Sequence, residues 1–264
     1  MLKIGVFDSG LGGLTVVKAL SKVIKNAQVF YVADTKNAPY GEKSPEEILQ
    51  YSLSITKYFI NCYDIDALVL ACNTATSFAI KELRALYPRL IIIGTEPGVK
   101  PAIERTQTGK IGILATPATL KGQKYQELVN TLATQKEVQL FEQACPGLVE
   151  QIEKGEISTI ETKKLLEKWI LPMQENNVDT IVLGCTHYPL VGEVITDMML
   201  RNVILIDTSK AIAKRLLELA LEKNHINEGG FSVNIATTGV IQNTFVEKIL
   251  QIPVNIQNID INKI

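Results

Sequence analysis

The chain has 264 residues, of which 46% are hydrophobic and 21% are charged, and this composition is typical of a globular protein with one large or two smaller domains. Its 27 basic and 28 acidic residues leave a formal net charge of −1, and no basic stripe indicates a nucleic-acid partner. No apolar run is long enough to cross a bilayer and the N-terminus has no signal-peptide pattern. We therefore expect a cytoplasmic protein without a membrane partner.

Predicted strands and helices alternate along the chain. Continuous apolar runs that end in small or polar residues are typical of buried parallel strands, and they occur at residues 2–7, 29–33, 67–72, 90–93, 110–114, 138–141, 180–185 and 203–206. Helical spacing follows most of these runs, at residues 14–24, after Ser44, from 73 or 74 towards 87, from about 120, after Ser158, from 191 and at 209–223. The alternation predicts an α/β fold with doubly wound parallel sheets.

Two helix starts carry recognisable caps. Ser44 is followed by Pro45 and by Glu47 at the third helical position, which predicts a capping box. Ser158 stands three residues before Glu161 and predicts a second cap of the same kind. Cys62 continues the apolar face of the helix after Ser44, so we predict that it is a core residue.

The sequence repeats itself in two places. The stretch from Asp66 to Thr74, DALVLACNT, returns as DTIVLGCTH from Asp179 to His187, and the opening KIGVFDS returns as KIGILAT at residues 110–116. Matched pairs in one order predict two related halves. The break at residues 95–98 and the absence of second-half counterparts for the last elements predict a first domain of residues 1–97 plus 208–264 and a second of residues 98–207.

The repeat gives each half one cysteine at the end of one strand, Cys72 and Cys185. The other two cysteines, Cys62 and Cys145, have no such echo. Cys62 is expected to be a core residue, and Cys145 a core residue or a bystander near the sheet end. No Cys-x-x-Cys pair occurs and the chain has only two histidines. A zinc site and disulfides are therefore not expected.

Ligands of open α/β sheets bind beyond the carboxyl ends of the strands, where both cysteines fall. A thiol at a helix N-terminus is favoured as a thiolate, and the same N–H groups can hold a carboxylate. Two opposed thiols suit inversion at a carbon atom, because one removes a proton from one face and the other returns a proton to the opposite face. Such chemistry needs neither metal nor cofactor, and we expect none.

The chain resembles the glutamate racemases of the cofactor-independent aspartate/glutamate racemase superfamily. The resemblance covers nearly the whole chain and rests on four motifs: GVFDSGLGGLT at residues 5–15, APYG at 38–41, ACNTA at 71–75 and GCTHYP at 184–189. It implies two pseudo-symmetric domains with the active site in the cleft between them. It also implies that Cys72 acts on D-glutamate and Cys185 on L-glutamate as the two acid/base residues.

Further roles follow from the resemblance alone. Auxiliary acid/base groups would be Asp8 beside Cys72, and Glu150 with His187 beside Cys185. The implied substrate contacts are Asp8, Ser9, Tyr40, Gly41, Asn73, Thr74, Thr186 and His187. The family supplies D-glutamate for peptidoglycan synthesis, and its members are commonly homodimers. The sequence starts at its first strand, without the N-terminal extension of some members, so the resemblance leaves activation by a cell-wall precursor open.

Three other functions remain open at the level of sequence. The turn at residues 10–13 after a strand, with Asp34 ending the next strand, imitates a dinucleotide-binding half, although the glycine spacing is wrong for the usual fingerprint. A two-lobed amino-acid-binding protein would share the internal repeat. An aspartate racemase would keep both cysteines and change the pocket. Asp8 itself has an alternative role as the cap of the following helix.

Overall fold

The computed structural model describes residues 1–136 and 138–261, with residues 124 and 132–136 described by their backbone alone. The chain divides into two compact units. Unit 1 comprises Met1–Thr95 together with the chain from Ser209 onward, and unit 2 comprises Glu96–Thr208. None of the helices in the described parts is both long and apolar enough to cross a lipid bilayer.

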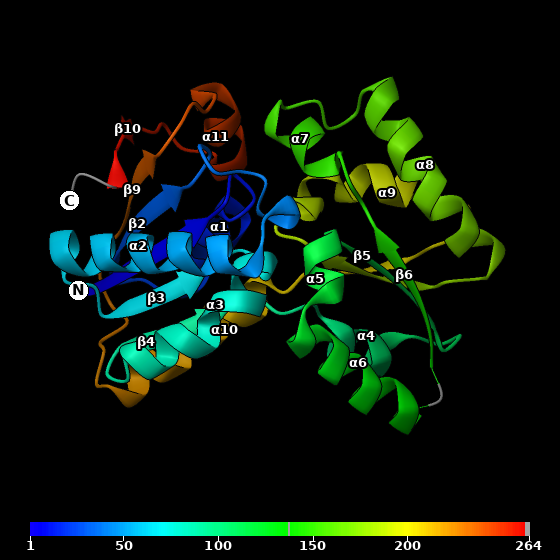
Figure 1. Ribbon diagram of the computed structural model, residues 1–264, viewed down its shortest axis with the longest axis horizontal. Coiled ribbons are helices and arrows are strands. Elements are labelled where there is room, and N and C mark those ends of the chain that lie inside the picture. The colour runs from blue at the N-terminus through cyan, green and yellow to red at the C-terminus, as the bar shows by residue number, and fades with distance from the viewer. Residues whose placement is uncertain (137, 262–264) are drawn as a thin grey trace. The chain divides into compact units, whose positions relative to one another are not determined.

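Unit 1 is built on a parallel sheet of six strands (Figure 1). The strands are β1 (Leu2–Asp8), β2 (Ala27–Ala33), β3 (Ala67–Leu70), β4 (Ile91–Gly94), β9 (Phe231–Thr237) and β10 (Ile256–Asn258). Their order is β10-β9-β2-β1-β3-β4. The last part of the chain therefore adds two strands to the sheet that the first part begins.

Helices cover the sheet of unit 1 in two groups. They are α1 (Leu14–Val23), α2 (Pro45–Tyr63), α3 (Asn73–Leu86), α10 (Ser209–Glu222) and α11 (Asn243–Leu250), with a 3₁₀ turn η1 (Tyr40–Glu42). Helix α2 packs against α3, and α1 packs against α10 and α11. Strands β1 and β3 are buried almost throughout, as expected of strands covered on both faces.

The predicted capping box of α2 is confirmed. Glu47 N donates to Ser44 Oγ at 3.3 Å, and Ser44 N donates to Glu47 Oε2 at 2.9 Å. The core prediction for Cys62 is wrong, because this thiol is exposed. In the last turn of α2 it is Tyr63 that packs on the core, with its ring stacked on Phe30 at 3.9 Å between ring centres.

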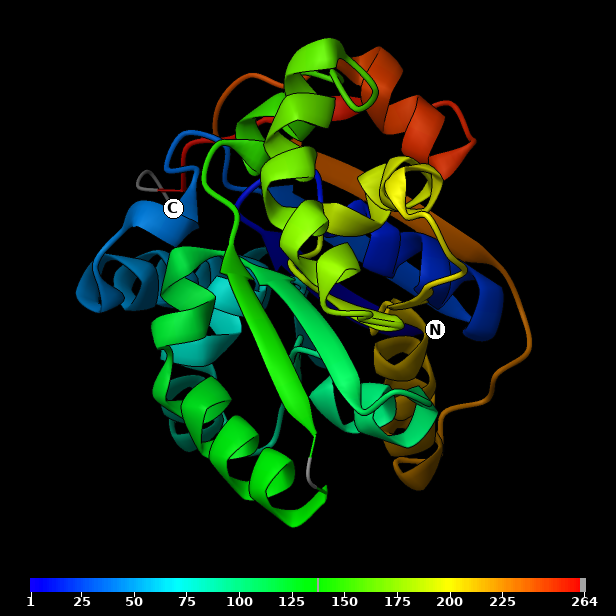
Figure 2. The ribbon, with the colours of Figure 1, turned by 90° about the vertical axis from the view of Figure 1, so that its right-hand side faces the viewer.

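Unit 2 has a four-stranded parallel sheet in the order β6-β5-β7-β8. Its strands are β5 (Lys110–Ala115), β6 (Gln139–Ala144), β7 (Thr180–Gly184) and β8 (Ile204–Ile206). Its helices are α4 (Val99–Arg105), α5 (Pro117–Lys121), α6 (Gln123–Lys136), α7 (Leu148–Glu153), α8 (Ile160–Glu175) and α9 (Gly192–Met198), with a 3₁₀ turn η2 (Tyr188–Val191). Figure 2 shows β5 and β6 with α6 to one side and α8 to the other.

The two units share one strand order. The sequence β2-β1-β3-β4 in unit 1 corresponds to β6-β5-β7-β8 in unit 2, in the same parallel sense. The prediction of an α/β fold with two related parallel-sheet domains is confirmed. Strands β3 and β7, which precede the two repeated cysteines, occupy equivalent positions in their sheets.

Local predictions in unit 2 differ from the structure in three respects. Helix α8 is capped by Thr159 and not by Ser158, because Thr159 Oγ1 accepts from Thr162 N at 3.3 Å. The helix expected from about residue 120 is two helices, α5 and α6, separated by the extended residue Gly122. Helices α4 and α7 were not expected, since both are short.

Candidate active site

Polar side chains gather at the carboxyl ends of the central strands in each unit. In unit 1 the last paired residues of β1 and β3 are Phe7 and Leu70, and Asp8 and Cys72 follow them. In unit 2 Ala115 of β5 pairs with Gly184 of β7, and Thr116 and Cys185 come next. Each unit therefore brings a thiol to the same edge of its sheet.

Cys72 is the N-cap residue of α3. Its backbone is extended, and its Sγ accepts a hydrogen bond from Ala75 N at 3.4 Å. Ser9 Oγ lies 4.0 Å from the same sulfur. Because backbone N–H groups and the positive end of a helix dipole both favour an anion, this position favours a thiolate.

Asp8 is buried at the end of β1 and fixes the turn that follows. Its Oδ1 accepts from Gly10 N at 2.8 Å and from Ser9 Oγ at 3.4 Å. The cap position of α1 belongs to Gly13 and not to Asp8. A carboxylate on the N–H of Gly10 also opposes a bound pyrophosphate, which argues against the dinucleotide-binding alternative.

Asn73, the first residue of α3, has a buried side chain that is only 4% exposed. Its Nδ2 and Oδ1 make no hydrogen bond to any residue that the structure describes. A buried amide without partners is costly, so this side chain suits a ligand that offers both an acceptor and a donor. Thr74 is buried beside it in the same helical turn.

Tyr40 begins the short turn η1, and Gly41 follows it. The Tyr40 hydroxyl donates to Asp34 Oδ2 at 2.6 Å. Burial, together with the negative charge of Asp34, holds the pKa of Tyr40 well above its usual value of 10.0. The Cys72 sulfur and the Asp8 carboxylate add to this rise, so Tyr40 is a neutral phenol near Cys72 and Asp8.

His187 joins two acid/base groups in unit 2. Its Nδ1 lies 3.7 Å from Cys185 Sγ, and its Nε2 contacts Glu153 Oε1. Burial lowers the pKa of His187, but the hydrogen bonds to Cys185 and Glu153 outweigh it and hold that pKa well above 6.5. His187 thus links Cys185 to Glu153 through its two ring nitrogens.

The carboxylate that contacts His187 belongs to Glu153. Glu150 was expected with His187 beside Cys185 as an auxiliary acid/base group, and that role stays a prediction. Both glutamates lie on α7, three residues apart. Glu150 lies near Tyr188. Burial is the main cause that raises the pKa of Tyr188, and the negative charge of Glu150 adds the smallest of the further contributions. Sequence reasoning missed Glu153, since residues at this spacing occupy one helix face and only the packing of α7 selects between them.

The remaining predicted site residues are Ser9 in unit 1 and Thr186 in unit 2. Ser9 is buried beside Asp8, and Thr186 is buried between Cys185 and His187. Cys145 is buried at the end of β6, and its thiol donates to Gln143 O at 3.4 Å. Burial raises the pKa of Cys145, so this thiol stays neutral. Among the described residues, no three His, Cys, Asp or Glu side chains are grouped so that they could hold a metal ion.

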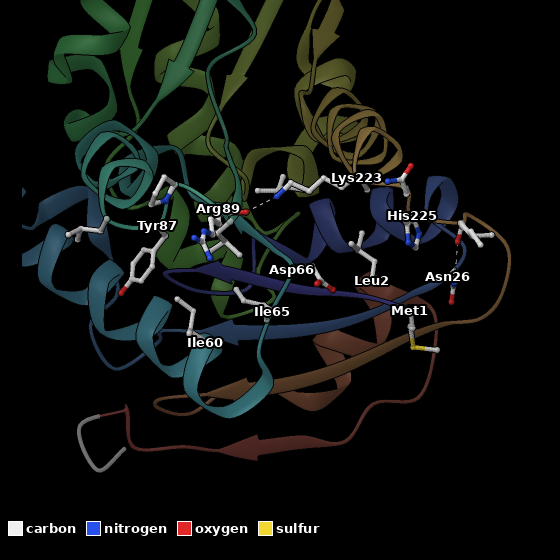
Figure 3. Close-up of a pocket in the computed structure, with 17 residues that line it drawn as sticks. Met1, Leu2, Asn26, Ile60, Ile65, Asp66, Tyr87, Arg89, Lys223 and His225 are labelled. Carbon is white, nitrogen blue, oxygen red and sulfur yellow. Dashed lines mark hydrogen bonds between the residues drawn. The ribbon is translucent and has the colours of Figure 1, made fainter.

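A cavity of about 820 Å³ lies at the opposite, amino end of the sheet of unit 1 (Figure 3). Leu2, Asp66 and Ile91 line it, and none of the predicted site residues does. Lys223 Nζ reaches across it to donate to Arg89 O at 2.6 Å. Leu86 at the end of α3 and Ala220 of α10 also line it, so this cavity lies apart from the strand ends that lead into the two thiols.

Comparison with known proteins shows the family of the chain. A family model described as Asp/Glu/Hydantoin racemase matches residues 4–216. The glutamate racemase of Sulfurovum sp. (strain NBC37-1) is 64% identical over 249 residues, which cover 94% of each chain.

Two solved structures have the same fold. The glutamate racemase from Francisella tularensis subsp. tularensis SCHU S4, in complex with D-glutamate, has a TM-score of 0.85 at 26% identity and covers 100% of this chain and 99% of its own. The Escherichia coli glutamate racemase, in complex with L-glutamate and the activator UDP-MurNAc-Ala, has a TM-score of 0.83 at 27% identity over 97% of both chains. The repeated thiols, the fold and these similarities lead to one conclusion: the chain belongs to the Asp/Glu/hydantoin racemase family, within its glutamate racemases.

Proposed function

We propose that this amino-acid racemase interconverts L- and D-glutamate with Cys72 and Cys185 as its two acid/base groups. The proposal places the two thiols on opposite faces of the substrate Cα, in the cleft between the two domains. The observation that carries it is the equivalent position of Cys72 after β3 and Cys185 after β7 in two sheets of one strand order. The glutamate complexes of the similar racemases support the choice of substrate.

The reaction then proceeds by one proton removal and one proton return. Starting from D-glutamate, the Cys72 thiolate takes the Cα proton, and the electron pair is held by the substrate carboxylate as a planar carbanion. The Cys185 thiol then gives its proton to the opposite face and becomes the thiolate. Starting from L-glutamate, the two cysteines exchange roles, so each turnover leaves the enzyme ready for the reverse reaction.

Removal of a proton from Cα requires that the negative charge be neutralised. We assign this task to the donors around the thiols, namely the amide of Asn73, the hydroxyls of Ser9, Thr74 and Thr186, and the backbone at Tyr40 and Gly41. Asp8 binds the substrate ammonium. His187 is held as a cation between Glu153 and Cys185 and stabilises the thiolate that acts on L-glutamate.

Isotope exchange tests this function directly. In heavy water and without added cofactor, each enantiomer of glutamate should acquire deuterium at Cα while its optical rotation decays to zero. Aspartate, assayed side by side, should exchange far more slowly. Faster exchange of aspartate would reassign the substrate, and binding of glutamate without any exchange would support an amino-acid-binding protein instead. Supply of D-glutamate for peptidoglycan, a cytoplasmic location and a homodimeric assembly stay predictions.

A further inference from the structure

Asp34 is a buried carboxylate that the proposed mechanism does not use. It follows β2, is only 1% exposed, and collects three side-chain donors. Tyr40 Oη donates to Oδ2 at 2.6 Å and Thr238 Oγ1 donates to Oδ1 at 2.7 Å, while Asn37 Nδ2 lies 3.0 and 3.1 Å from the two oxygens. Buried carboxylates are rare unless they are paired in this way.

The donors come from separate parts of unit 1. Tyr40 and Asn37 belong to the loop after β2, whereas Thr238 follows β9 and lies about two hundred residues further along the chain. Further bonds run beside this one: Thr35 Oγ1 is 2.8 Å from Thr237 Oγ1, and Lys36 N donates to Thr238 Oγ1 at 3.1 Å. Asp34 N also donates to the carbonyl of Asp8 at 2.9 Å. Asp34 thus ties the Tyr40 loop to β9 and to the strand end that carries Asp8.

We propose that Asp34 is a positioning residue, which holds Tyr40 and thereby sets the place of the Tyr40–Gly41 backbone against the substrate. This inference rests on the proposed function, in which that backbone contacts glutamate. A tyrosine hydroxyl can donate a single hydrogen bond, and here Asp34 Oδ2 accepts it. The Tyr40 side chain therefore cannot donate to a substrate carboxylate at the same time, and its part is to anchor the loop.

The test is a double-mutant cycle in the full chain. Asp34→Asn keeps the shape but exchanges one acceptor for a donor, so the three donors can no longer all be satisfied. We expect KM for both enantiomers to rise about tenfold, the scale of one charged hydrogen bond, with kcat changed about threefold or less. Tyr40→Phe should raise KM similarly, and the double variant should be no worse than either single one because both act through one contact.

Asp179→Asn is the matched control. Asp179 also accepts several hydrogen bonds, from Thr106 Oγ1 at 2.6 Å and from Gln107 N and Thr108 N at 2.7 and 2.8 Å, but it precedes β7 at the amino end of its sheet. Its variant should lose stability and keep KM. An Asp34→Asn variant that likewise loses stability without a change in KM would overturn the positioning role, as would independent, multiplying effects of the Asp34 and Tyr40 substitutions on KM.

A wild-type chain that fails to racemise glutamate would instead contradict the proposed function. In that case the Asp34–Tyr40 contact is measured without a substrate. The free energies of unfolding of the wild type, the two single variants and the double variant of the cycle give its strength. Additive losses of stability there would overturn the contact itself.

Discussion

His187 is held between a sulfur and a carboxylate, and the balance of its neighbours sets its charge. Burial opposes the imidazolium, whereas Cys185 and Glu153 favour it, and the net pKa lies well above 6.5. Below about pH 6.5 the imidazole is charged in the unfolded chain too, so its favourable contacts then count fully towards stability. As pH rises through the raised pKa, this contribution is lost.

Glu153→Gln should therefore destabilise the protein by about 1–2 kcal/mol at pH 6, the scale of a charged hydrogen bond with one partly exposed partner. The difference from wild type should shrink as pH rises through the raised pKa of His187, and urea unfolding at several pH values measures it. The same variant should deprotonate L-glutamate about tenfold more slowly. Glu150→Gln, one helical turn away, is the control; a larger loss from this second variant would reverse the assignment.

The sequence alone could identify the two thiols. It could not show whether Glu150 or Glu153 is the residue that contacts His187. Cys72 and Cys185 are marked by a repeated pattern in which the strand, the cysteine and the following polar residues all match. Glu150 and Glu153 are residues of the same type on one helix. Only the packing of α7 against His187 determines that Glu153 makes the contact. The orphaned amide of Asn73 was likewise named through family resemblance, since its missing partners appear only once the fold is known.

At the scale of elements, β5 and β7 approach each other closely at Gly184, the residue before Cys185. A Cβ on Gly184 would lie 2.9 Å from both Leu114 O and Ala115 Cβ, closer than such atoms can pack. The glycine before Cys185 therefore lets the two strands approach closely at this point.

Gly184→Ala should cost about 1–3 kcal/mol of stability, because backbone on the neighbouring strand must move. It should also lower kcat, since Cys185 shifts with the end of β7. Thermal unfolding and steady-state rates measure both effects. Gly230→Ala serves as control, because an added Cβ there meets nothing within 4 Å. Equal stability of the two variants would show that β7 adapts without strain.

The strands that are buried on two faces have the clearest sequence pattern. Strands β1, β3 and β7 read as apolar runs because helices cover both sides of them. Strand β10 has three residues, none of them buried, and its pairing with β9 is a matter of tertiary contact that leaves no apolar pattern. The core prediction for Cys62 is wrong for the converse reason. Its helical phase suits the core, but at the end of α2 it is Tyr63 that packs there, on Phe30.

At the scale of the whole molecule, the proposed reaction needs one thiol from each unit. Cys72→Ser and Cys185→Ser should each lower turnover by about 10²–10⁴-fold, the usual worth of a general acid/base group. Cys72→Ser should still exchange the Cα proton of L-glutamate and fail with D-glutamate, and Cys185→Ser should show the reverse. Mass spectrometry of each enantiomer in heavy water separates the two. Equal residual exchange from both enantiomers in either variant would refute the division of labour.

Unit 1 is completed by a part of the chain that is synthesised after unit 2. Protein domains generally fold as units during synthesis, and unit 2 can close its sheet once β8 has emerged. The sheet of unit 1 must wait for β9, which pairs with β2 and follows all of unit 2 in the chain. Until then the nascent polypeptide presents the free edge of β2, a surface on which strands of other chains can assemble. Translation that stalls before β9 would thus yield a finished second half attached to an aggregation-prone first half.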